Sequence, residues 1–162
     1  EPCGMGGTGE FDLELPIPNL ALGYQRVESE NGRFHWENNL FKHLVKGGPG
    51  GGGFSTVDDL FNFSMALRRN ILVTPETLAR LYSENPGTGD EKHVWGYGFI
   101  VRRDPDLGRI TGHSGGFFGI DTCLWMYQDT GFTVVILSNY GNGAKAITAA
   151  LRQCLLGLNS VR

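Results

Sequence analysis

The sequence contains no apolar run long enough to cross a bilayer and no excess of basic side chains. A membrane-spanning helix needs about 20 consecutive apolar residues, and no segment of the 162-residue chain provides them. The formal net charge is −3, with acidic and basic residues interspersed, so a nucleic-acid-binding surface has no electrostatic support. We therefore expect neither a membrane segment nor a nucleic-acid partner.

Metal-binding and disulfide patterns are missing as well. The three cysteines, Cys3, Cys123 and Cys154, lie too far apart for a CxxC or zinc motif. The four histidines show no HExxH or paired spacing. We expect no metal, no cofactor and buried thiols at Cys123 and Cys154, and we expect ordinary surface or core positions for the first three histidines. These are His35, His43 and His93.

The composition is that of a packed globular domain. Hydrophobic residues make up 40% of the chain and aromatic residues 11%, which suits a folded core and not a disordered tail. We divide the single domain, residues 1–162, where the sequence changes character. Loops and a hairpin are expected over 1–54, helices over 55–92, and a sheet with a C-terminal helix over 93–162.

The first two regions carry clear turn and cap signals. Asn31-Gly32 is a strong hairpin dipeptide between the extended segments 20–27 and 33–36. Ser55 or Thr56 can cap a first helix, and Thr74 followed by Pro75 begins a second. The expected apolar stripe of the first helix is Val57, Leu60, Phe61, Ser64 and Leu67.

Extended segments with short connections follow His93, so we expect antiparallel neighbouring strands. These segments are 94–101, 109–113, 120–127 and 132–138. A helix over 144–156 closes the chain, and its expected apolar stripe is Ile147, Ala150, Leu151, Cys154 and Leu155. The expected fold class is α+β: an antiparallel sheet with preceding helices and a covering C-terminal helix.

Gly112-His113-Ser114-Gly115-Gly116 is the segment richest in reactive side chains. It matches the G-x-S-x-G nucleophile elbow, which requires a strand, a sharp turn and then a helix. Here the sequence leads into another strand, and no histidine follows His113. An α/β-hydrolase-type esterase with Ser114 as nucleophile is therefore the least favoured hypothesis, and a polar β-turn without function is the plain alternative.

Several segments occur in an order that is typical of one known family. They are Gly50–Thr56 with Asp59-Leu60, Trp95–Phe99, Gly112–Gly116, Asp129–Gly131 and Val134–Asn139. From about Leu20 to Leu156 the chain thus resembles the C-terminal portion of the serine β-lactamase and penicillin-binding-protein superfamily, especially its class C-like hydrolases and esterases. Gly112–Gly116 resembles the third motif, the Lys-Thr-Gly box, in a histidine variant. The resemblance implies a partial β-lactamase/transpeptidase-like fold. It leaves the localisation open, although a periplasmic or secreted parent protein would be compatible with it.

Two motifs of that family are missing or misplaced. No serine has a lysine three positions later, so the Ser-x-x-Lys nucleophile motif is absent. Tyr140-Gly141-Asn142 has the letters of the Tyr-x-Asn motif but follows the third motif instead of preceding it. Because both motifs belong to the family's N-terminal half, we expect a C-terminal fragment that is inactive by itself.

The resemblance implies roles for four residues. In such enzymes a serine attacks an amide or ester carbonyl and forms an acyl-enzyme. His113 would take the place of the box lysine, and the Gly116 N–H would be one of two oxyanion donors, so both are expected to be catalytic. Ser114 and Gly115 would bind the substrate, a small molecule or a peptide-like chain.

An alternative from another functional class is a non-catalytic binding or interaction module that keeps the cleft but does not catalyse a reaction.

A further expectation concerns self-association. In the family, strands of the N-terminal half complete the sheet beside its last strand. Residues 132–138 would then form an open apolar edge, and we expect a homo-oligomer that covers it.

Overall fold

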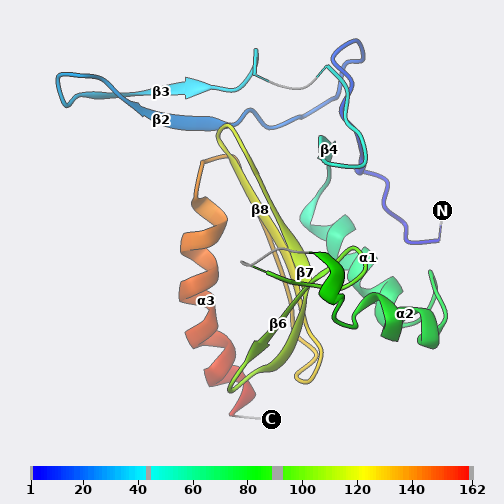
Figure 1. Ribbon diagram of the computed structural model, residues 1–162. Coiled ribbons are helices and arrows are strands. Elements are labelled where there is room, and N and C mark those ends of the chain that lie inside the picture. Colours follow the sequence, from blue (N-terminus) through cyan, green and yellow to red (C-terminus); the bar gives the residue numbers. More distant parts are fainter. Residues whose placement is uncertain (1, 43–44, 89–92, 161–162) are drawn as a thin grey trace.

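The computed structural model describes residues 2–42, 45–88 and 93–160, and its centre is a five-stranded antiparallel sheet (Figure 1). The strands lie in sequence order: β5 (Val94–Trp95), β6 (Ile100–Asp104), β7 (Gly108–Phe117), β8 (Ile120–Tyr127) and β9 (Thr133–Ser138). Helix α3 (Gly143–Asn159) covers one face, and α1 (Val57–Arg68) and α2 (Pro75–Leu81) cover the other. The α+β class expected from the sequence is confirmed.

Two small sheets precede the main one. β1 (Gly9–Glu10) pairs with β4 (Gly53–Phe54), and β2 (Tyr24–Glu28) pairs with β3 (Phe34–Asn38), both antiparallel. The β2–β3 hairpin turns around Asn31-Gly32, as expected, and projects from one end of the main sheet (Figure 1). A short 3₁₀ helix, η1 (Pro86–Thr88), follows α2.

The alternation of side chains along β8 divides the buried residues into two clusters. Cys123, Trp125 and Tyr127 face α3 and pack with its Leu155. Leu124 and Met126 point the other way. There they pack against residues of α1, of α2 and of the segments that follow these helices, namely Phe63, Leu67, Leu72, Val73, Leu78, Leu81 and Tyr82. The sheet is therefore covered on both faces near β8.

Both predicted helix starts are confirmed, but the buried face of α1 differs from the prediction. The Thr56 and Thr74 hydroxyls accept hydrogen bonds from the backbone N–H groups of Asp59 and Thr77. Val57 and Phe61 were expected to be buried, yet both are exposed. The buried residues of α1 are Asp59, Ser64, Ala66 and Leu67. Polar contacts explain part of the difference, because the Asp59 carboxylate accepts hydrogen bonds from Gly7 and Thr8.

The predicted apolar stripe of α3 is confirmed in part, because its Leu151 and Leu155 pack in the core beneath the sheet. Ala144 and Leu155 are buried, whereas Ile147 and Cys154 are exposed. The predicted burial of Cys154 is therefore wrong, and that of Cys123 is confirmed. The helix is also longer than predicted, beginning at Gly143 and ending at Asn159. Ala144, Leu151 and Leu155 share the face of the helix that packs against the sheet, and Ile147 lies off that face.

The segment 94–101 was expected to be one strand and is instead a hairpin of β5 and β6. Val94 pairs with Val101, and Trp95 with Ile100. Gly98 adopts a positive φ of 86° in the turn, a conformation that glycine adopts without steric cost. The turn lies against the end of α2, where the Tyr97 N–H donates to the Leu81 carbonyl oxygen at 2.9 Å.

Backbone contacts hold the β2–β3 hairpin against the end of the main sheet. The Tyr24 N–H lies 2.8 Å from the Asn139 carbonyl oxygen and 3.2 Å from that of Gly119, in the β7–β8 turn. Buried Asn39 accepts a hydrogen bond from the Gly23 N–H at 2.9 Å. Gly119 has a φ of 67°, and a Cβ there would lie 2.3 Å from the Tyr24 nitrogen. We call these residues, Gly23, Tyr24, Asn39, Gly119 and Asn139, the hairpin clasp.

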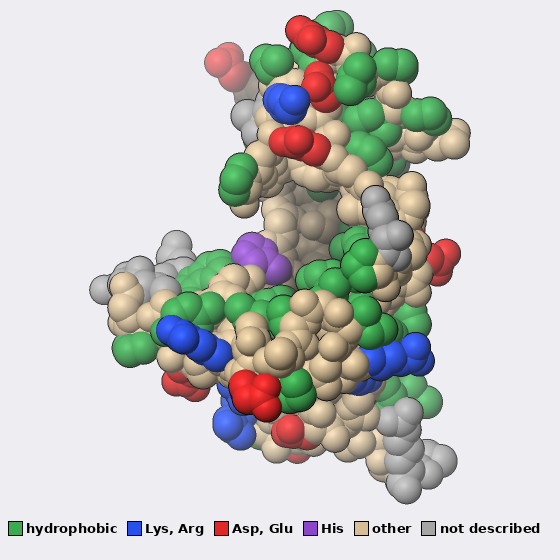
Figure 2. All heavy atoms as spheres, turned by 90° about the vertical axis from the view of Figure 1, so that its right-hand side faces the viewer, with side chains coloured by type: hydrophobic (Ala, Val, Ile, Leu, Met, Phe, Trp, Pro, Cys, Tyr) green, Lys and Arg blue, Asp and Glu red, His purple; other side chains and the backbone are tan. Residues whose placement is uncertain are grey.

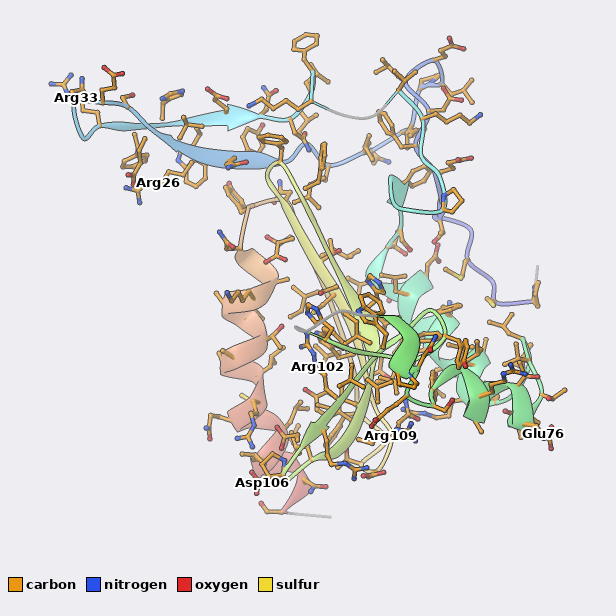
Figure 3. All side chains as sticks on the ribbon, viewed as in Figure 1. Arg26, Arg33, Glu76, Arg102, Asp106 and Arg109 are labelled. Carbon is orange, nitrogen blue, oxygen red and sulfur yellow. The ribbon has the colours of Figure 1, made fainter. Side chains whose placement is uncertain are left out.

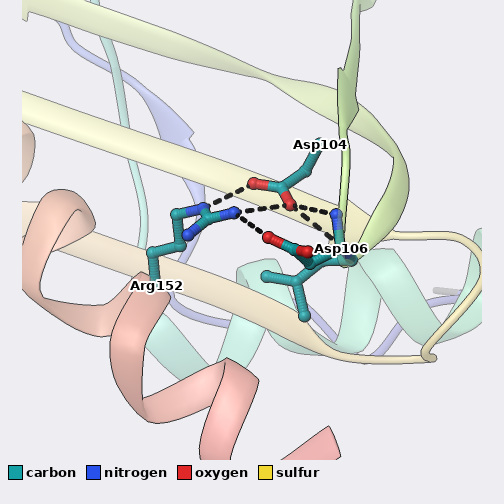
Figure 4. Close-up of polar contacts among 4 residues, drawn as sticks. Asp104, Asp106 and Arg152 are labelled. Carbon is teal, nitrogen blue, oxygen red and sulfur yellow. Dashed lines mark hydrogen bonds and ion pairs between the residues drawn. The ribbon is translucent and has the colours of Figure 1, made fainter.

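An ion pair fastens α3 to the β6–β7 turn. Arg152 donates from Nε to Asp104 Oδ2 at 2.7 Å and from Nη2 to Asp106 Oδ2 at 2.6 Å (Figure 4). Asp104 also accepts hydrogen bonds from the backbone N–H groups of Asp106 and Leu107. Hydrogen bonds from Arg152 lower the pKa of Asp104 from 3.8 to about 2.

Within the described residues, no helix is long and apolar enough to cross a membrane.

This ion pair predicts a specific dependence of stability on pH. Because the pKa of Asp104 is lowered by folding, the stabilisation is complete above about pH 4 and is lost as the pH falls toward 2. Arg152→Ala should lower the urea midpoint at neutral pH and flatten the decline between pH 4 and 2. Urea unfolding from pH 7 to 2 measures both effects. Arg33→Ala removes the same charge from the exposed hairpin tip and should keep the wild-type decline; equal curves for the two variants would contradict this assignment.

Candidate functional site

The segment Gly112–Gly116 lies inside a strand, not at the end of one. The sequence suggested a strand that ends at His113, but β7 continues to Phe117 and turns at Phe118-Gly119 into β8. Each residue of the segment has a partner on β8, from Gly112 opposite Trp125 to Gly116 opposite Asp121. The segment therefore has a fixed, extended backbone.

The opposite edge of the same segment is open. Strand β6 pairs with β7 only as far as Gly112, which lies opposite Ile100. Within the described ranges, no strand pairs with that edge from His113 to Phe117. The Gln128 N–H donates to the Arg109 carbonyl oxygen, so the odd-numbered residues of β7 direct their backbone groups toward β8. The even-numbered Ser114 and Gly116 consequently direct their N–H and C=O groups to the open edge.

The glycines of the segment differ in what surrounds them. A Cβ on buried Gly112 would lie 2.0 Å from the Leu124 carbonyl oxygen, so packing inside the chain requires glycine there. A Cβ on Gly115 would approach Thr122 Oγ1 at 3.4 Å, and one on Gly116 would lie 3.7 Å from the Ile120 carbonyl oxygen. Packing within the described chain does not require glycine at Gly115 or Gly116. Their small size instead leaves the open edge accessible to another molecule.

His113 and Ser114 point to opposite faces of the sheet, because side chains alternate along a strand. Ser114 lies opposite Cys123 on the α3 face. The His113 imidazole is exposed, and its Nδ1 lies 2.7 Å from the Ser114 carbonyl oxygen. The Trp95 ring centroid lies 5.3 Å from that of His113. The two side chains therefore do not form one surface across the strand.

Two hollows flank the sheet, and one of them reaches this segment. One, of about 580 Å³, lies between the hairpin, the β7–β8 turn and the start of α3. It is lined by Gln25, Arg26, Trp36, Gly116, Phe117, Ile120, Asp121, Gly141 and Asn142. Figure 3 shows Arg26 extending from the side of the hairpin that faces the sheet. Of the four predicted site residues, Gly116 is the one that lines this hollow.

The second hollow, of about 620 Å³, is rich in basic side chains. Arg102, Arg103 and Arg109 line it together with His93, Val94, Val101 and Glu84. The Arg102 guanidinium lies 4.1 Å from the centre of the Trp125 ring, and partial burial lowers its pKa. On the face that carries α1 and α2, the molecule is hollowed between the N-terminal loops and the helices, with a histidine side chain at the rim (Figure 2).

A row of aromatic side chains on the hairpin was not anticipated. Trp36 meets Tyr140 edge to face at 5.3 Å, and Phe34 and Tyr24 extend the row on either side. Tyr140 and Asn142 lie in the β9–α3 loop, where Asn142 is the N-cap of α3. The expected loop at Tyr140-Gly141-Asn142 is therefore confirmed. The sequence signal that could have predicted the aromatic row is the alternation of Phe34 and Trp36, which places two aromatic side chains on the same face of β3.

The other histidines have separate surroundings. His35 lies on β3, with Nε2 3.0 Å from Glu37 Oε1, and His93 lies beside Trp95. His43 lies outside the described residues. Across 2–42, 45–88 and 93–160, no group of three or more His, Cys, Asp and Glu side chains is arranged to hold a metal ion.

The different surroundings of the glycines give a prediction for two matched substitutions. Gly112→Ala should reduce the free energy of unfolding by about 2–4 kcal/mol, because the new methyl group meets the Leu124 carbonyl oxygen. Gly116→Ala should change it by less than about 1 kcal/mol. Urea unfolding followed by circular dichroism measures both values. Equal losses in the two variants would show that Gly116 is also required for packing.

Comparison with known proteins finds one family. A family model described as Beta-lactamase matches residues 1–156. Penicillin-binding protein 4* of Bacillus subtilis (strain 168) is 30% identical over 145 residues, which is 85% of this chain and 32% of that protein. The chain thus spans about a third of the length of this curated relative.

Solved structures show the same arrangement. A penicillin binding protein from Bacillus halodurans superposes with a TM-score of 0.80 at 25% identity, covering 94% of this chain and 46% of that one. The octameric penicillin-binding protein homologue from Pyrococcus abyssi has a TM-score of 0.68 at 23% identity, over 96% and 35%. A D-stereospecific amidohydrolase from Streptomyces sp. has a TM-score of 0.59 at 20% identity, over 92% and 44%. The last two likenesses concern the fold alone.

Proposed function

The chain belongs to the beta-lactamase family, and from this premise we propose that it is the C-terminal part of a serine hydrolase that cleaves amide or ester bonds through an acyl-enzyme. Support comes from the share of the relatives that it covers, 32% of the curated protein and 46% of the Bacillus halodurans chain. The sequence contains no Ser-x-x-Lys motif. The nucleophile would therefore be supplied by the remainder of the family domain.

The open edge of β7 is the observation that carries this proposal. Ser114 and Gly116 direct backbone N–H and C=O groups to that edge, and the alternation in β7 supports an outward Gly116 N–H. An outward N–H can donate to the oxygen of a carbonyl under attack, and a second donor would come from the nucleophile's own backbone. Loss of one such donor typically slows the reaction about 100- to 1,000-fold.

His113 and the residues beside it would complete this side of the site. By the resemblance to the third family motif, His113 would take the place of the box lysine, close to the start of the open edge. An extended, peptide-like substrate could pair with the backbone of Ser114, and Gly115 lets it approach closely. A histidine loses its charge near neutral pH, whereas a lysine does not. This favours a peptidase or an esterase over an efficient β-lactamase.

A non-catalytic binding module is the second candidate, favoured by the absence of a Ser-x-x-Lys serine from a chain that keeps an accessible edge. The third hypothesis, an α/β-hydrolase with Ser114 as nucleophile, lacks geometric support. Ser114 lies in the middle of an antiparallel strand that continues into another strand, whereas a nucleophile elbow leads into a helix.

A covalent probe experiment tests the proposal. A fluorophosphonate and a fluorescent penicillin should leave this chain unlabelled, because it lacks the nucleophile. A longer natural chain that includes the family's Ser-x-x-Lys motif should be labelled at that serine. In the longer chain, His113→Ala should slow acylation while folding is retained.

The outcomes separate the three hypotheses. Labelling of this chain at Ser114 would support the α/β-hydrolase reading and refute the proposal. Failure of a folded longer chain to label, together with retained binding of the intact probe, would support the binding module instead.

We also propose that the chain associates with itself through β9. This strand is the last of the sheet, and within the described residues no other strand pairs with its outer edge. Val134, Val135 and Ile136 make it apolar, and Leu137 is exposed. Unpaired apolar edges promote association between chains. The Pyrococcus abyssi homologue is octameric, which is compatible with assembly in this fold.

Light scattering at micromolar concentration tests this association. The wild-type chain should have at least twice the monomer mass, and Leu137→Lys should shift it to the monomer by placing a charge beside the edge. Ile147→Lys, on the exposed side of α3, should leave the assembly unchanged. A monomeric wild-type chain, or dissociation by the α3 substitution alone, would exclude β9 as the interface.

A further inference from the structure

The His113 ring is held by two contacts from opposite parts of the site. Its Nδ1 lies 2.7 Å from the Ser114 carbonyl oxygen. A carbonyl oxygen only accepts hydrogen bonds, so Nδ1 must carry the proton in this contact. In the neutral imidazole the other nitrogen, Nε2, then has a free lone pair and acts as an acceptor.

The second contact comes from Trp95. The indole and imidazole centroids lie 5.3 Å apart with an interplanar angle of 54°, a geometry in which aromatic rings attract one another. Trp95 is half-buried and packs against the cluster that faces α3. It is thus fixed by the core on one side and meets His113 on the other.

The position of Trp95 is determined by the turn that follows it. The Asn85 N–H donates to the Trp95 carbonyl oxygen at 2.6 Å, and the Tyr97 N–H donates to that of Leu81. A Cβ on Gly96 would lie 2.4 Å from the Leu81 carbonyl oxygen, so this turn fits closely against the end of α2. Because β6 begins only at Ile100, opposite Gly112, the Trp95 ring can reach the first residue of the open edge.

We propose that Trp95 is a positioning residue for His113: its indole and the Ser114 carbonyl together hold the imidazole as the Nδ1–H tautomer, which presents Nε2 as a hydrogen-bond acceptor. A lysine at this position of the family motif can only donate. His113 therefore accepts a hydrogen bond from a hydroxyl group, of the substrate or of the missing half of the site. The catalytic meaning of this orientation depends on the proposed function, whereas the orientation itself does not.

Among the described residues, few charged or titratable groups lie around the ring. His93 lies on the other side of Trp95, at 6.0 Å between ring centroids. Arg103 and Arg109 share the face of His113 by strand alternation, and Glu84 follows α2 and lines the same basic hollow. From β8, the facing side chains are the uncharged Leu124 and Thr122. Variants of His93 are therefore the necessary control in any titration of His113.

The tautomer can be measured directly by long-range ¹H–¹⁵N correlation spectra of the histidine rings, recorded at a pH well above the ordinary histidine pKa of about 6.5. His113→Asn assigns the His113 signals. The wild-type chain should show His113 in the Nδ1–H form, although the Nε2–H form is favoured for free histidine. Trp95→Leu should lower the ratio of the two forms about two- to tenfold, whereas Trp95→Phe should retain it. Trp36→Leu, in the hairpin, is the matched control and should change nothing.

Two results would overturn the proposal: a wild-type His113 in the Nε2–H form, or a ratio that Trp95→Leu leaves unchanged. If Trp95→Leu does not fold, tryptophan fluorescence gives a second readout, because a protonated imidazole quenches a neighbouring indole. On acidification, the tryptophan fluorescence of the wild-type chain should fall. This fall should be lost in His113→Asn and retained in part in His93→Asn. An unchanged fall in His113→Asn would likewise refute the contact.

These measurements need no nucleophile, so they separate the two proposals. Retention of the Nδ1–H form in a family domain that no probe labels would refute the proposed hydrolase and leave the positioning role of Trp95 in place. Labelling of the longer chain, with no effect of Trp95→Leu on the tautomer, would do the reverse.

Discussion

Strand β7 is hydrogen-bonded along both edges as far as Gly112 and along one edge beyond it, and the candidate site begins at that point. The change occurs because β6 begins at Ile100, directly after the turn that follows Trp95. One edge therefore gives the backbone of Ser114 and Gly116 a fixed direction. On the other edge no described strand pairs with them, and the Ser114 carbonyl oxygen accepts a hydrogen bond from His113 Nδ1. Pairing with β8 supplies the rigidity that a binding edge needs, without any contribution from the site's own side chains.

The hairpin clasp extends this arrangement to the far end of the open edge. Gly119 closes the β7–β8 turn, and its carbonyl oxygen also accepts a hydrogen bond from the Tyr24 N–H. The hairpin therefore attaches at the turn where the site ends. The aromatic row of the hairpin and the hollow lined by Gly116 and Trp36 are consequences of that attachment. Both ends of the edge thus carry an indole, Trp95 at one and Trp36 at the other.

The sequence predicted most elements because their signals are local. Caps at Thr56 and Thr74 and the Asn31-Gly32 turn depend on a few adjacent residues, and each was placed correctly. The hairpin inside 94–101 was missed because a run of aromatic and β-branched residues favours a strand whether or not the chain reverses within it. The burial of Cys154 and Phe61 was misjudged because an apolar stripe does not say which of its members a particular sheet covers. At the candidate site, the motif pointed to His113 and Gly116, but the proposed role of Trp95 depends on where β6 begins, which is a property of tertiary pairing.

The order of the main sheet has a consequence for how the molecule forms. All five strands pair with their neighbours in the sequence, joined by short turns, and α3 follows directly after the last of them. Contacts between residues close in sequence have a small entropic cost of loop closure and form quickly. The hairpin instead attaches through Tyr24 and Gly119, which are separated by most of the chain. We therefore infer that the sheet and α3 assemble first and that the hairpin docks onto their completed end, so that the backbone of the site forms before the aromatic row beside it.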